Sequence, residues 1–339
     1  MKPLVILDQH PRKLEELFSP EDYERLASRF ELVGAQNWPL DQARLAQHLP
    51  TAFALIGSEP VLGPAELKSA PRLKAVIEVL GRFPATIDYA ACAARKVAAL
   101  SCAPGFQQSV AEMGLGLILA CARGIVTEHE RFRTGTERWL FDDARWDFSL
   151  YRQKIGFVGY GSIARELSRL LSPFAPQIAA YDPWLSDRGA DTGDVALVSL
   201  ADILTSCRCI VITASPTDEN RGLIGAEEIA AMAPGSSVVL LSRAHLVDFE
   251  ALLAAGREKR IRLATDVFPL EPVPDDHPVR NLRNLILSPH RAAAVPGGRH
   301  LIGRMIVDDL ELIRDGGQAQ HLQPVNLETI EKRLGALRS

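Results

Sequence analysis

The stretch KIGFVGYGSIAREL combines a glycine spacing and a hydrophobic pattern that could seat a dinucleotide. Residues Ile155–Val158 are apolar or glycine and predict a short buried strand, after which a helical stretch begins. Between them, Gly159, Gly161 and Ala164 have the spacing G-x-G-x-x-A. In such a motif the first glycine permits the turn and the second lets the backbone approach a pyrophosphate, while the third small residue lets the helix pack on the strand. By itself, the motif also fits a plain tight turn.

An acidic residue at the end of the next predicted strand favours the dinucleotide. The strand Ile178–Tyr181 ends at Asp182, 23 residues after Gly159. A carboxylate there would accept both ribose hydroxyls of an adenosine and would repel the extra phosphate of NADP. Because the first arginine after it is Arg188, we expect NAD rather than NADP. The alternative is a turn residue, since Asp182 precedes Pro183.

Three further stretches each place a chargeable residue straight after a predicted strand. In a doubly wound sheet, these strand ends line the ligand crevice. The stretches are LLSRAHLVD (240–248), ATDVFPLEPVP (264–274) and LSPHRAAAVPGG (287–298).

With these motifs in order, the sequence resembles the D-isomer-specific 2-hydroxy-acid dehydrogenase family, which includes phosphoglycerate, glycerate and formate dehydrogenases. The resemblance covers nearly the whole chain, is strongest over residues 156–290, and includes SPTDENRGLIGAEEIAAMAPG. It implies a catalytic Arg–Glu–His set that maps onto Arg243, Glu271 and His290, and an acid that holds the nicotinamide carboxamide, here Asp266.

The chemistry of such an enzyme requires these residue types. Reduction of a 2-oxo acid delivers a hydride to carbon and a proton to the carbonyl oxygen, and a histidine such as His290 is the natural acid near neutral pH. Glu271 beside it would orient the ring and keep it protonated. The planar, always charged fork of Arg243 suits a carboxylate together with a carbonyl oxygen. Alternatively, His290 is an incidental histidine, Glu271 is a solvated loop acid and Arg243 is a partner in a surface salt bridge.

The sequence departs from the family in the loop whose backbone N–H groups usually hold the substrate carboxylate. This loop is glycine-rich in the family, and LGRFPATID (80–88) replaces it here. We expect Gly81, Arg82 and Arg243 to contact the substrate, with Arg82 either binding a second anionic group or lying exposed. His245 stands where the family usually has glycine, and we interpret it as structural or pocket-lining. The expected cofactor contacts are Gly159, Gly161, Ser162, Ile163, Asp182, Ser215, Pro216 and Asp266.

Length and composition restrict the class of protein. A chain of 339 residues predicts about two domains, and a net charge of −4 argues against a nucleic-acid-binding face. The longest apolar run, Met113–Ala122, is about half a membrane span, so we expect a buried helix and no membrane partner. The five cysteines lack zinc-type spacing. They predict buried reduced thiols, no metal site and a cytoplasmic location.

Regular alternation of short apolar strands with helices predicts an α/β fold of two doubly wound, Rossmann-like parallel sheets. The expected strands are Leu4–Leu7, Phe53–Ile56, Leu73–Val79, Val97–Ser101, Ile155–Val158, Ile178–Tyr181, Cys209–Ala214, Ser237–Leu241, Ile261–Asp266 and Leu285–Leu287. The expected helices include Pro20–Arg29, Gln108–Arg123, Val247–Lys259 and Leu301–Arg314.

The resemblance also implies how the domains and subunits are organised. A substrate-binding domain would comprise residues 1–102 plus 293–339, and an NAD-binding domain residues 103–292, with the active-site cleft between them. Family members are typically homodimers that pair through the cofactor domain, where the Met113–Ala122 helix would serve. The leading hypothesis is an NAD-dependent enzyme that interconverts a D-2-hydroxy acid and its 2-oxo acid. The alternative is a non-catalytic NAD(H)-sensing or corepressor-like protein on the same fold.

Overall fold

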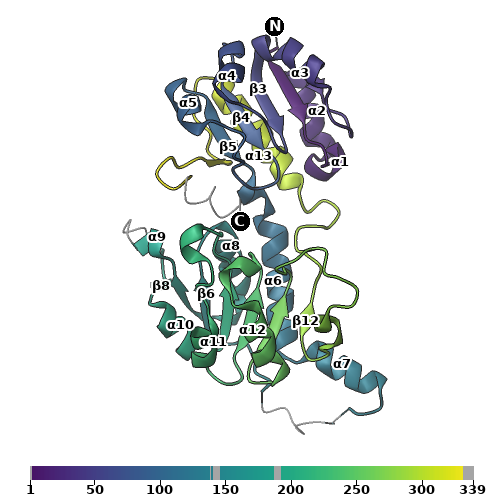
Figure 1. The fold of residues 1–339 in the computed structure, drawn as a ribbon, viewed down its shortest axis with the longest axis vertical. Coiled ribbons are helices and arrows are strands. Elements are labelled where there is room, and N and C mark those ends of the chain that lie inside the picture. The colour runs from purple at the N-terminus through teal and green to yellow at the C-terminus, as the bar shows by residue number, and fades with distance from the viewer. Residues whose placement is uncertain (1, 138, 140–145, 187–191, 331–339) are drawn as a thin grey trace. The chain divides into compact units, whose positions relative to one another are not determined.

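The computed structural model describes the chain except residues 1, 138, 140–145, 187–191 and 331–339 (Figure 1). The chain divides into two compact units, one of residues 1–107 with 295–339 and one of residues 108–294. Each unit is built on a sheet of parallel strands with helices between them. The predicted α/β fold class is therefore confirmed. The assignment of one unit to the substrate and the other to the cofactor stays a prediction.

The first unit contains a six-stranded sheet in the order β13-β5-β4-β3-β1-β2, parallel except for β13, which runs antiparallel to β5. Its strands are β1 Leu4–Asp8, β2 Glu31–Gly34, β3 Ala52–Gly57, β4 Ala75–Glu78, β5 Ala98–Ser101 and β13 Gln323–Pro324. Its α-helices are α1 Leu14–Leu17, α2 Pro20–Arg29, α3 Gln42–His48, α4 Pro64–Ser69, α5 Tyr89–Ala94 and α13 His300–Arg314.

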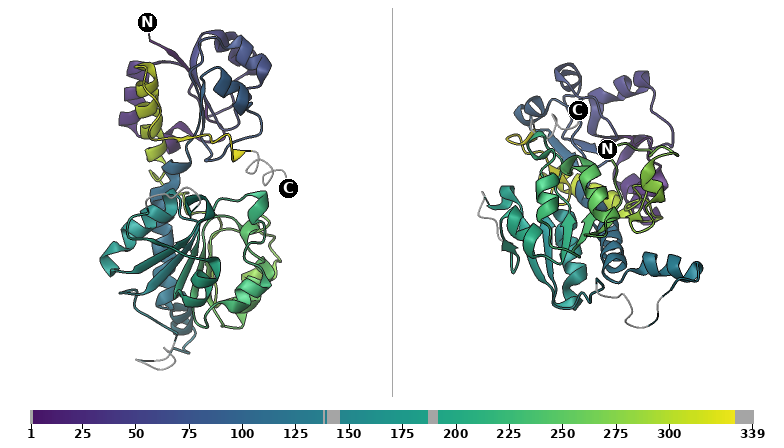
Figure 2. Two further views of the ribbon diagram at one scale, coloured as in Figure 1. Left: turned by 90° about the vertical axis from the view of Figure 1, so that its left-hand side faces the viewer. Right: turned by 60° about the horizontal axis from the view of Figure 1, so that its bottom comes forward.

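Both faces of this first sheet are buried under helices. Because successive strand residues point to opposite faces, Ile6 joins one apolar cluster and Val5 joins the other. The cluster of Ile6 includes Leu67 of α4, and the cluster of Val5 includes Ile306 of α13. Figure 2 shows α13, near the C-terminal end of the chain, lying against α2 from the other end of the sequence.

The second unit contains a seven-stranded, all-parallel sheet in the order β12-β11-β10-β9-β6-β7-β8. Its strands are β6 Lys154–Val158, β7 Gln177–Tyr181, β8 Ala196–Leu197, β9 Cys209–Ile212, β10 Ser237–Leu240, β11 Arg262–Thr265 and β12 Ile286–Leu287. Its α-helices are α6 Gln107–Ala122, α7 Ile125–Arg133, α8 Ser162–Leu171, α9 Pro183–Ser186, α10 Leu200–Ser206, α11 Ala226–Ala231 and α12 Phe249–Arg257.

All ten predicted strands are present, whereas β2, β8 and β13 were not predicted. These three lie at sheet edges, so few of their residues face the core. In β2 the buried residue is Val33, β8 has two residues, and β13 contains Pro324. An edge strand of this kind lacks the apolar run that marks a central strand.

The cysteines and the hydropathy of the helices bear on the class of protein. All five cysteines are free and buried, as predicted. Among the described residues, no single helix has the length and hydropathy to cross a membrane. The helical segments 103–122 and 125–133 meet both criteria only when they are counted together, and a 60° bend separates them.

Candidate active site

The sheet of the second unit brings the predicted catalytic and cofactor-binding residues to one edge. Strands β6 and β9 are neighbours although β7 lies between them in sequence, so the strand order reverses at this pair. Ligands of open α/β sheets bind beyond the carboxyl ends of strands at such a switch point. Gly159 follows β6, Ser215 follows β9, Arg243 follows β10, Asp266 follows β11 and His290 follows β12. Because the strands are parallel, these residues share the carboxyl edge.

The two glycines of the G-x-G motif have different structural roles. Gly159 has a φ of 87°, and a Cβ on it would lie 2.4 Å from the Cα of Ala214, so this position accommodates only glycine. A Cβ on Gly161 would meet no atom within 4 Å. Gly161 is the N-cap of α8 without a side-chain cap, and the N–H groups of Ser162 and Ile163 have no intrahelical partner. This open, amide-lined helix start fits a pyrophosphate.

Asp182 ties the glycine loop to the next helix. Its Oδ2 accepts the N–H of Tyr160 at 2.8 Å, while Oδ1 accepts those of Trp184 and Leu185 at 3.1 and 3.3 Å. The turn role that we considered for Asp182 is therefore observed, and its contact with a ribose stays a prediction. Arg188, the arginine that bears on the choice between NAD and NADP, lies outside the described residues.

The loop after β9 carries Ser215 and Pro216 and is braced from two sides. The amide of Asn220 donates to the carbonyl oxygen of Ser215, and its Oδ1 accepts the N–H of Thr217, both at 2.8 Å. His245, from the loop after β10, places Nε2 2.7 Å from the carbonyl oxygen of Thr217. This contact makes His245 a structural link between the loops that carry Ser215 and Arg243.

Glu271 and His290 are in direct contact. Oε2 of Glu271 lies 2.6 Å from Nδ1 of His290, and Oε1 accepts the N–H of Phe268 at 2.8 Å. The histidine side chain is 45% exposed, so its Nε2 can reach a ligand. His290 also has a φ of 52°, a left-handed conformation that costs a residue with a Cβ roughly 1–2 kcal/mol. Strain of this kind is concentrated at functional sites.

Asp266 holds the segment that carries His290. Its carboxylate is 1% exposed and accepts the hydroxyl of Ser288 and the N–H groups of Arg291 and Ala292. Its carbonyl oxygen accepts the N–H of His290 at 2.8 Å. We did not predict this set of contacts from the sequence, because it joins residues 22 to 26 positions apart. Contact between Asp266 and a nicotinamide stays a prediction.

Arg243 lies exposed in the loop after β10, and its Nη1 donates to the carbonyl oxygen of Ser242 at 2.7 Å. Strand β10 is next to β11, and β11 is next to β12. Arg243 therefore starts from the same carboxyl edge of the sheet as His290, two strands away. Substrate contact by Arg243 stays a prediction.

In the first unit, the loop LGRFPATID is organised by a buried acid. Glu78, the last residue of β4, is 1% exposed and accepts the N–H groups of Leu80, Gly81 and Arg82 at 2.6, 2.9 and 2.8 Å. Burial raises the pKa of the Glu78 carboxyl to about 7. The backbone donors expected to hold a substrate carboxylate are thus directed at Glu78. We did not predict this role of Glu78, although a charged residue inside the apolar run KAVIEVLG is unusual.

The two residues of this loop that we expect at the substrate are held by the protein itself. Gly81 has a φ of 85°, and a Cβ there would lie 2.7 Å from the ring of Phe106. The guanidinium of Arg82 forms an ion pair with Glu59, and its side chain is 39% exposed. Substrate contact by Gly81 and Arg82 stays a prediction.

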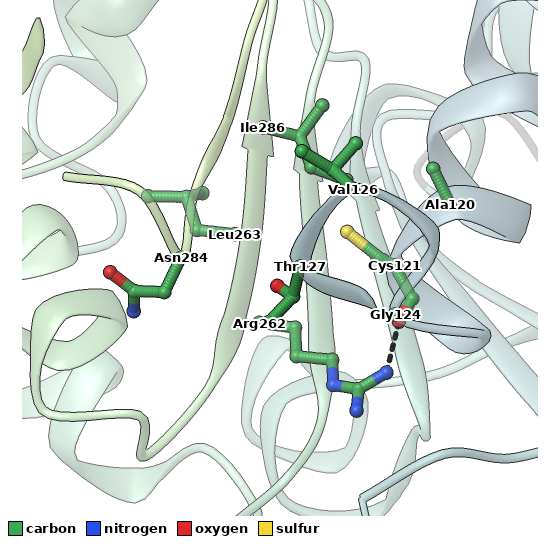
Figure 3. Close-up of a pocket in the computed structure, with 9 residues that line it drawn as sticks. All are labelled: Ala120, Cys121, Gly124, Val126, Thr127, Arg262, Leu263, Asn284 and Ile286. Carbon is green, nitrogen blue, oxygen red and sulfur yellow. Dashed lines mark hydrogen bonds between the residues drawn. The ribbon is translucent and has the colours of Figure 1, made fainter. Parts of the chain in front are cut away.

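A small pocket elsewhere in the second unit has no part in this arrangement. Figure 3 shows it between α6, α7 and the first residues of β11 and β12, with Cys121, Thr127 and Ile286 in its lining. Arg262 donates to the carbonyl oxygen of Cys121 across it. Because Arg262 and Ile286 begin their strands, the pocket lies at the amino edge, opposite the candidate site.

Comparison with known proteins decides the family. The model of the family described as "D-isomer specific 2-hydroxyacid dehydrogenase, NAD binding domain" matches residues 115–292, more than half of the chain. The chain belongs to this family. The resemblance inferred from the sequence is confirmed, and the matched residues lie within the second unit.

Relatives support the same assignment. The chain is similar to D-3-phosphoglycerate dehydrogenase of Methanocaldococcus jannaschii, with 31% identity over 278 residues, 80% of this chain and 51% of that protein. It is also similar to glyoxylate/hydroxypyruvate reductase B of Yersinia enterocolitica, with 27% identity over 318 residues, 91% of this chain and 94% of that one. The chain spans about half the length of the phosphoglycerate dehydrogenases that it matches.

A solved structure extends the likeness to the whole chain. The structure described as a phosphoglycerate oxidoreductase from Rhizobium etli has a TM-score of 0.85 and 35% identity. The match covers 97% of this chain and 100% of that one. Both units of the fold are therefore shared with that protein.

Proposed function

We propose that this chain is an NAD-dependent dehydrogenase that interconverts a D-2-hydroxy acid and its 2-oxo acid. The observation that carries the proposal is the 2.6 Å contact between Glu271 and His290 at the carboxyl edge of the dinucleotide-binding sheet. A carboxylate–histidine pair at this place suits an acid that protonates a ketone. A protein that only senses NAD(H) requires no proton transfer, so this pair favours the enzyme.

The cofactor would occupy the loops after β6, β7 and β9. Gly159 and Gly161 with Ser162 and Ile163 would hold the pyrophosphate. Asp182 would accept the ribose hydroxyls and, by charge repulsion, favour NAD over NADP. Further contacts to the cofactor would come from Ser215, Pro216 and Asp266. When bound, the nicotinamide supplies the hydride for reduction and accepts it in oxidation.

His290 would handle the proton. In reduction, its Nε2 donates a proton to the carbonyl oxygen of the 2-oxo acid, and in oxidation it takes the proton back from the hydroxyl. Glu271 holds Nδ1 in place and stabilises the positive charge of the imidazolium. Asp266 keeps the loop of His290 in its strained conformation. The substrate carboxylate and carbonyl oxygen would bind the fork of Arg243.

We further propose a homodimer that pairs through the cofactor-binding unit. Helix α6 has a second apolar face, on which Met113, Leu115 and Leu119 are half-buried and Gly116 has no neighbour within 4 Å of a Cβ position. On α7, Phe132 is 64% exposed. A second copy would cover these apolar side chains. Light scattering of the purified protein should give twice the chain mass of 37.1 kDa.

The five buried thiols suit a reducing compartment such as the cytoplasm.

The enzyme proposal is tested by following NADH oxidation against glyoxylate, hydroxypyruvate, its phosphate ester, pyruvate and bulkier 2-oxo acids. We expect turnover with at least one of them and a preference for NADH over NADPH. Tight NADH binding without turnover on the whole panel would support the sensing alternative instead.

A further inference from the structure

Two arginines of the first unit share a single carboxylate. Arg12 lies in the segment that follows β1, and Arg299 is the N-cap residue of α13. Nη1 of Arg299 is 2.7 Å from Oε2 of Glu16, and Nη1 of Arg12 is 3.9 Å from the same oxygen. Two guanidinium groups therefore make their salt bridges to one carboxylate.

Both guanidinium groups are largely buried, yet each has a nitrogen without a hydrogen-bond partner among the described residues. The side chains of Arg299 and Arg12 are 14% and 27% exposed. The Nε of each is buried without a hydrogen-bond partner among the described residues. Burial and the charge of Arg299 lower the pKa of Arg12. Proteins seldom bury charged donors without an acceptor, because the desolvation cost is not recovered.

The N-terminus of helix α13 makes the electrostatic potential near Arg299 more positive. It has 15 residues, its N-cap side chain makes no capping hydrogen bond, and its first turn contains no acid. The start of a helix carries roughly half a positive charge. The surroundings of Arg299 thus favour an anion.

Neighbouring donors at the same edge of the sheet are already occupied. The N–H groups after β4 bind Glu78, and the guanidinium of Arg82 binds Glu59. Glu16 and Glu78 are the acids whose charges act on Arg12. An anion that reaches this edge therefore finds its unmet donors on Arg12 and Arg299.

We propose that Arg12 and Arg299 form a binding site for a compact anion, a phosphate or carboxylate group. Planar arginine forks match both groups, and hydrogen bonds between two charged partners are among the stronger ones in proteins. The group could be carried by the substrate or could arrive as free phosphate. The site itself follows from the contacts in the first unit, and only its attribution to the substrate rests on the proposed dehydrogenase activity.

Binding is tested by titrating inorganic phosphate, and separately malonate, into the full chain by calorimetry. The variants are Arg12→Gln, Arg299→Gln and, as matched control, Arg304→Gln, an arginine on α13 whose side chain is 62% exposed. We expect the first two variants to bind phosphate at least about tenfold more weakly than the wild-type chain, and the control to bind it with unchanged affinity. Glu16→Gln should tighten binding, because it removes the carboxylate that competes with the added anion for both arginines.

The opposite-signed effect of Glu16→Gln keeps the test decisive if an arginine variant folds poorly. Equal affinity in the wild-type protein, Arg12→Gln and Arg299→Gln, or no binding of either anion at millimolar concentration, would overturn the proposal.

A kinetic comparison then identifies the source of the anion. Hydroxypyruvate and its phosphate ester differ in one phosphate group. A loss in kcat/KM for the ester alone in Arg299→Gln assigns the site to the substrate, whereas unchanged kinetics with lost phosphate binding assigns it to free anion. If no 2-oxo acid of the panel is turned over, the proposed dehydrogenase fails, while the calorimetric result on the anion site still stands.

Discussion

Oε2 of Glu271 lies 2.6 Å from Nδ1 of His290, although 19 residues separate them in the sequence. The other carboxylate oxygen accepts the N–H of Phe268, so the acid cannot rotate away without losing a bond. This arrangement fixes the orientation of the ring and leaves Nε2 as the nitrogen that would exchange a proton in the proposed reaction.

Glu271→Gln should lower turnover by roughly 10- to 100-fold. With Oε1 still accepting from Phe268, the new amide presents N–H groups to Nδ1, so the ring loses its acceptor and takes the wrong tautomer. The measurement is kcat with the best 2-oxo acid, with Asp275→Asn as control because Asp275 is exposed in the same loop. A Glu271→Gln enzyme within twofold of the wild-type kcat would contradict this role.

Substitutions at Gly159 and Gly161 should separate stability from cofactor binding. Gly159→Ala forces a Cβ against the backbone of Ala214 at a positive φ, and should cost about 1–3 kcal/mol of unfolding free energy. Gly161→Leu meets open space, so its Tm should stay near the wild-type value while NADH binds at least about tenfold more weakly. Thermal unfolding and fluorescence titration with NADH measure both quantities. Unweakened NADH binding by folded Gly161→Leu would refute the proposed pyrophosphate position.

Asp182→Asn should reduce the preference for NADH over NADPH by about tenfold, because it removes the charge that repels the 2′-phosphate. The ratio of the two kcat/KM values is the measurement. Asp194→Asn, in the exposed loop before β8, is the matched control. An unchanged ratio in Asp182→Asn would show that the carboxylate only holds the backbone of Tyr160 and Trp184.

Central strands and the cofactor motif could be predicted because each is contained in a continuous stretch of sequence. The apolar runs gave β6 and β10, and the spacing of Gly159 and Gly161 gave the turn between β6 and α8. The clamps could not be predicted in this way. Asp266 binds Ser288, 22 residues later, and Arg12 and Arg299 approach the same oxygen of Glu16 only after α13 packs onto the first sheet. Such contacts depend on tertiary packing, which periodicity does not encode.

The buried Glu78 should make stability depend on pH. Burial raises its pKa from 4.5 to about 7 in the folded chain. Between these values the folded state binds more protons than the unfolded state. The contribution of Glu78 to stability is therefore fully present below about pH 4.5 and is lost as the pH rises to about 7, by on the order of 3 kcal/mol.

Urea unfolding at pH 5, 6 and 7.5 tests this dependence. Glu78→Gln cannot ionise, so its free energy of unfolding should fall less than that of the wild-type chain over the same range, whatever its absolute stability. Parallel curves for the two proteins would exclude Glu78 as the group responsible.

The most direct test of the account compares the wild-type chain with His290→Ala, measuring turnover of the best 2-oxo acid and NADH affinity on the same preparations. We predict that the variant loses at least about 100-fold in kcat, because the proton donor is gone, while its NADH dissociation constant changes by less than twofold. A His290→Ala protein that still reduces the 2-oxo acid at a rate near that of the wild type would contradict the assignment of His290 as the acid of this site.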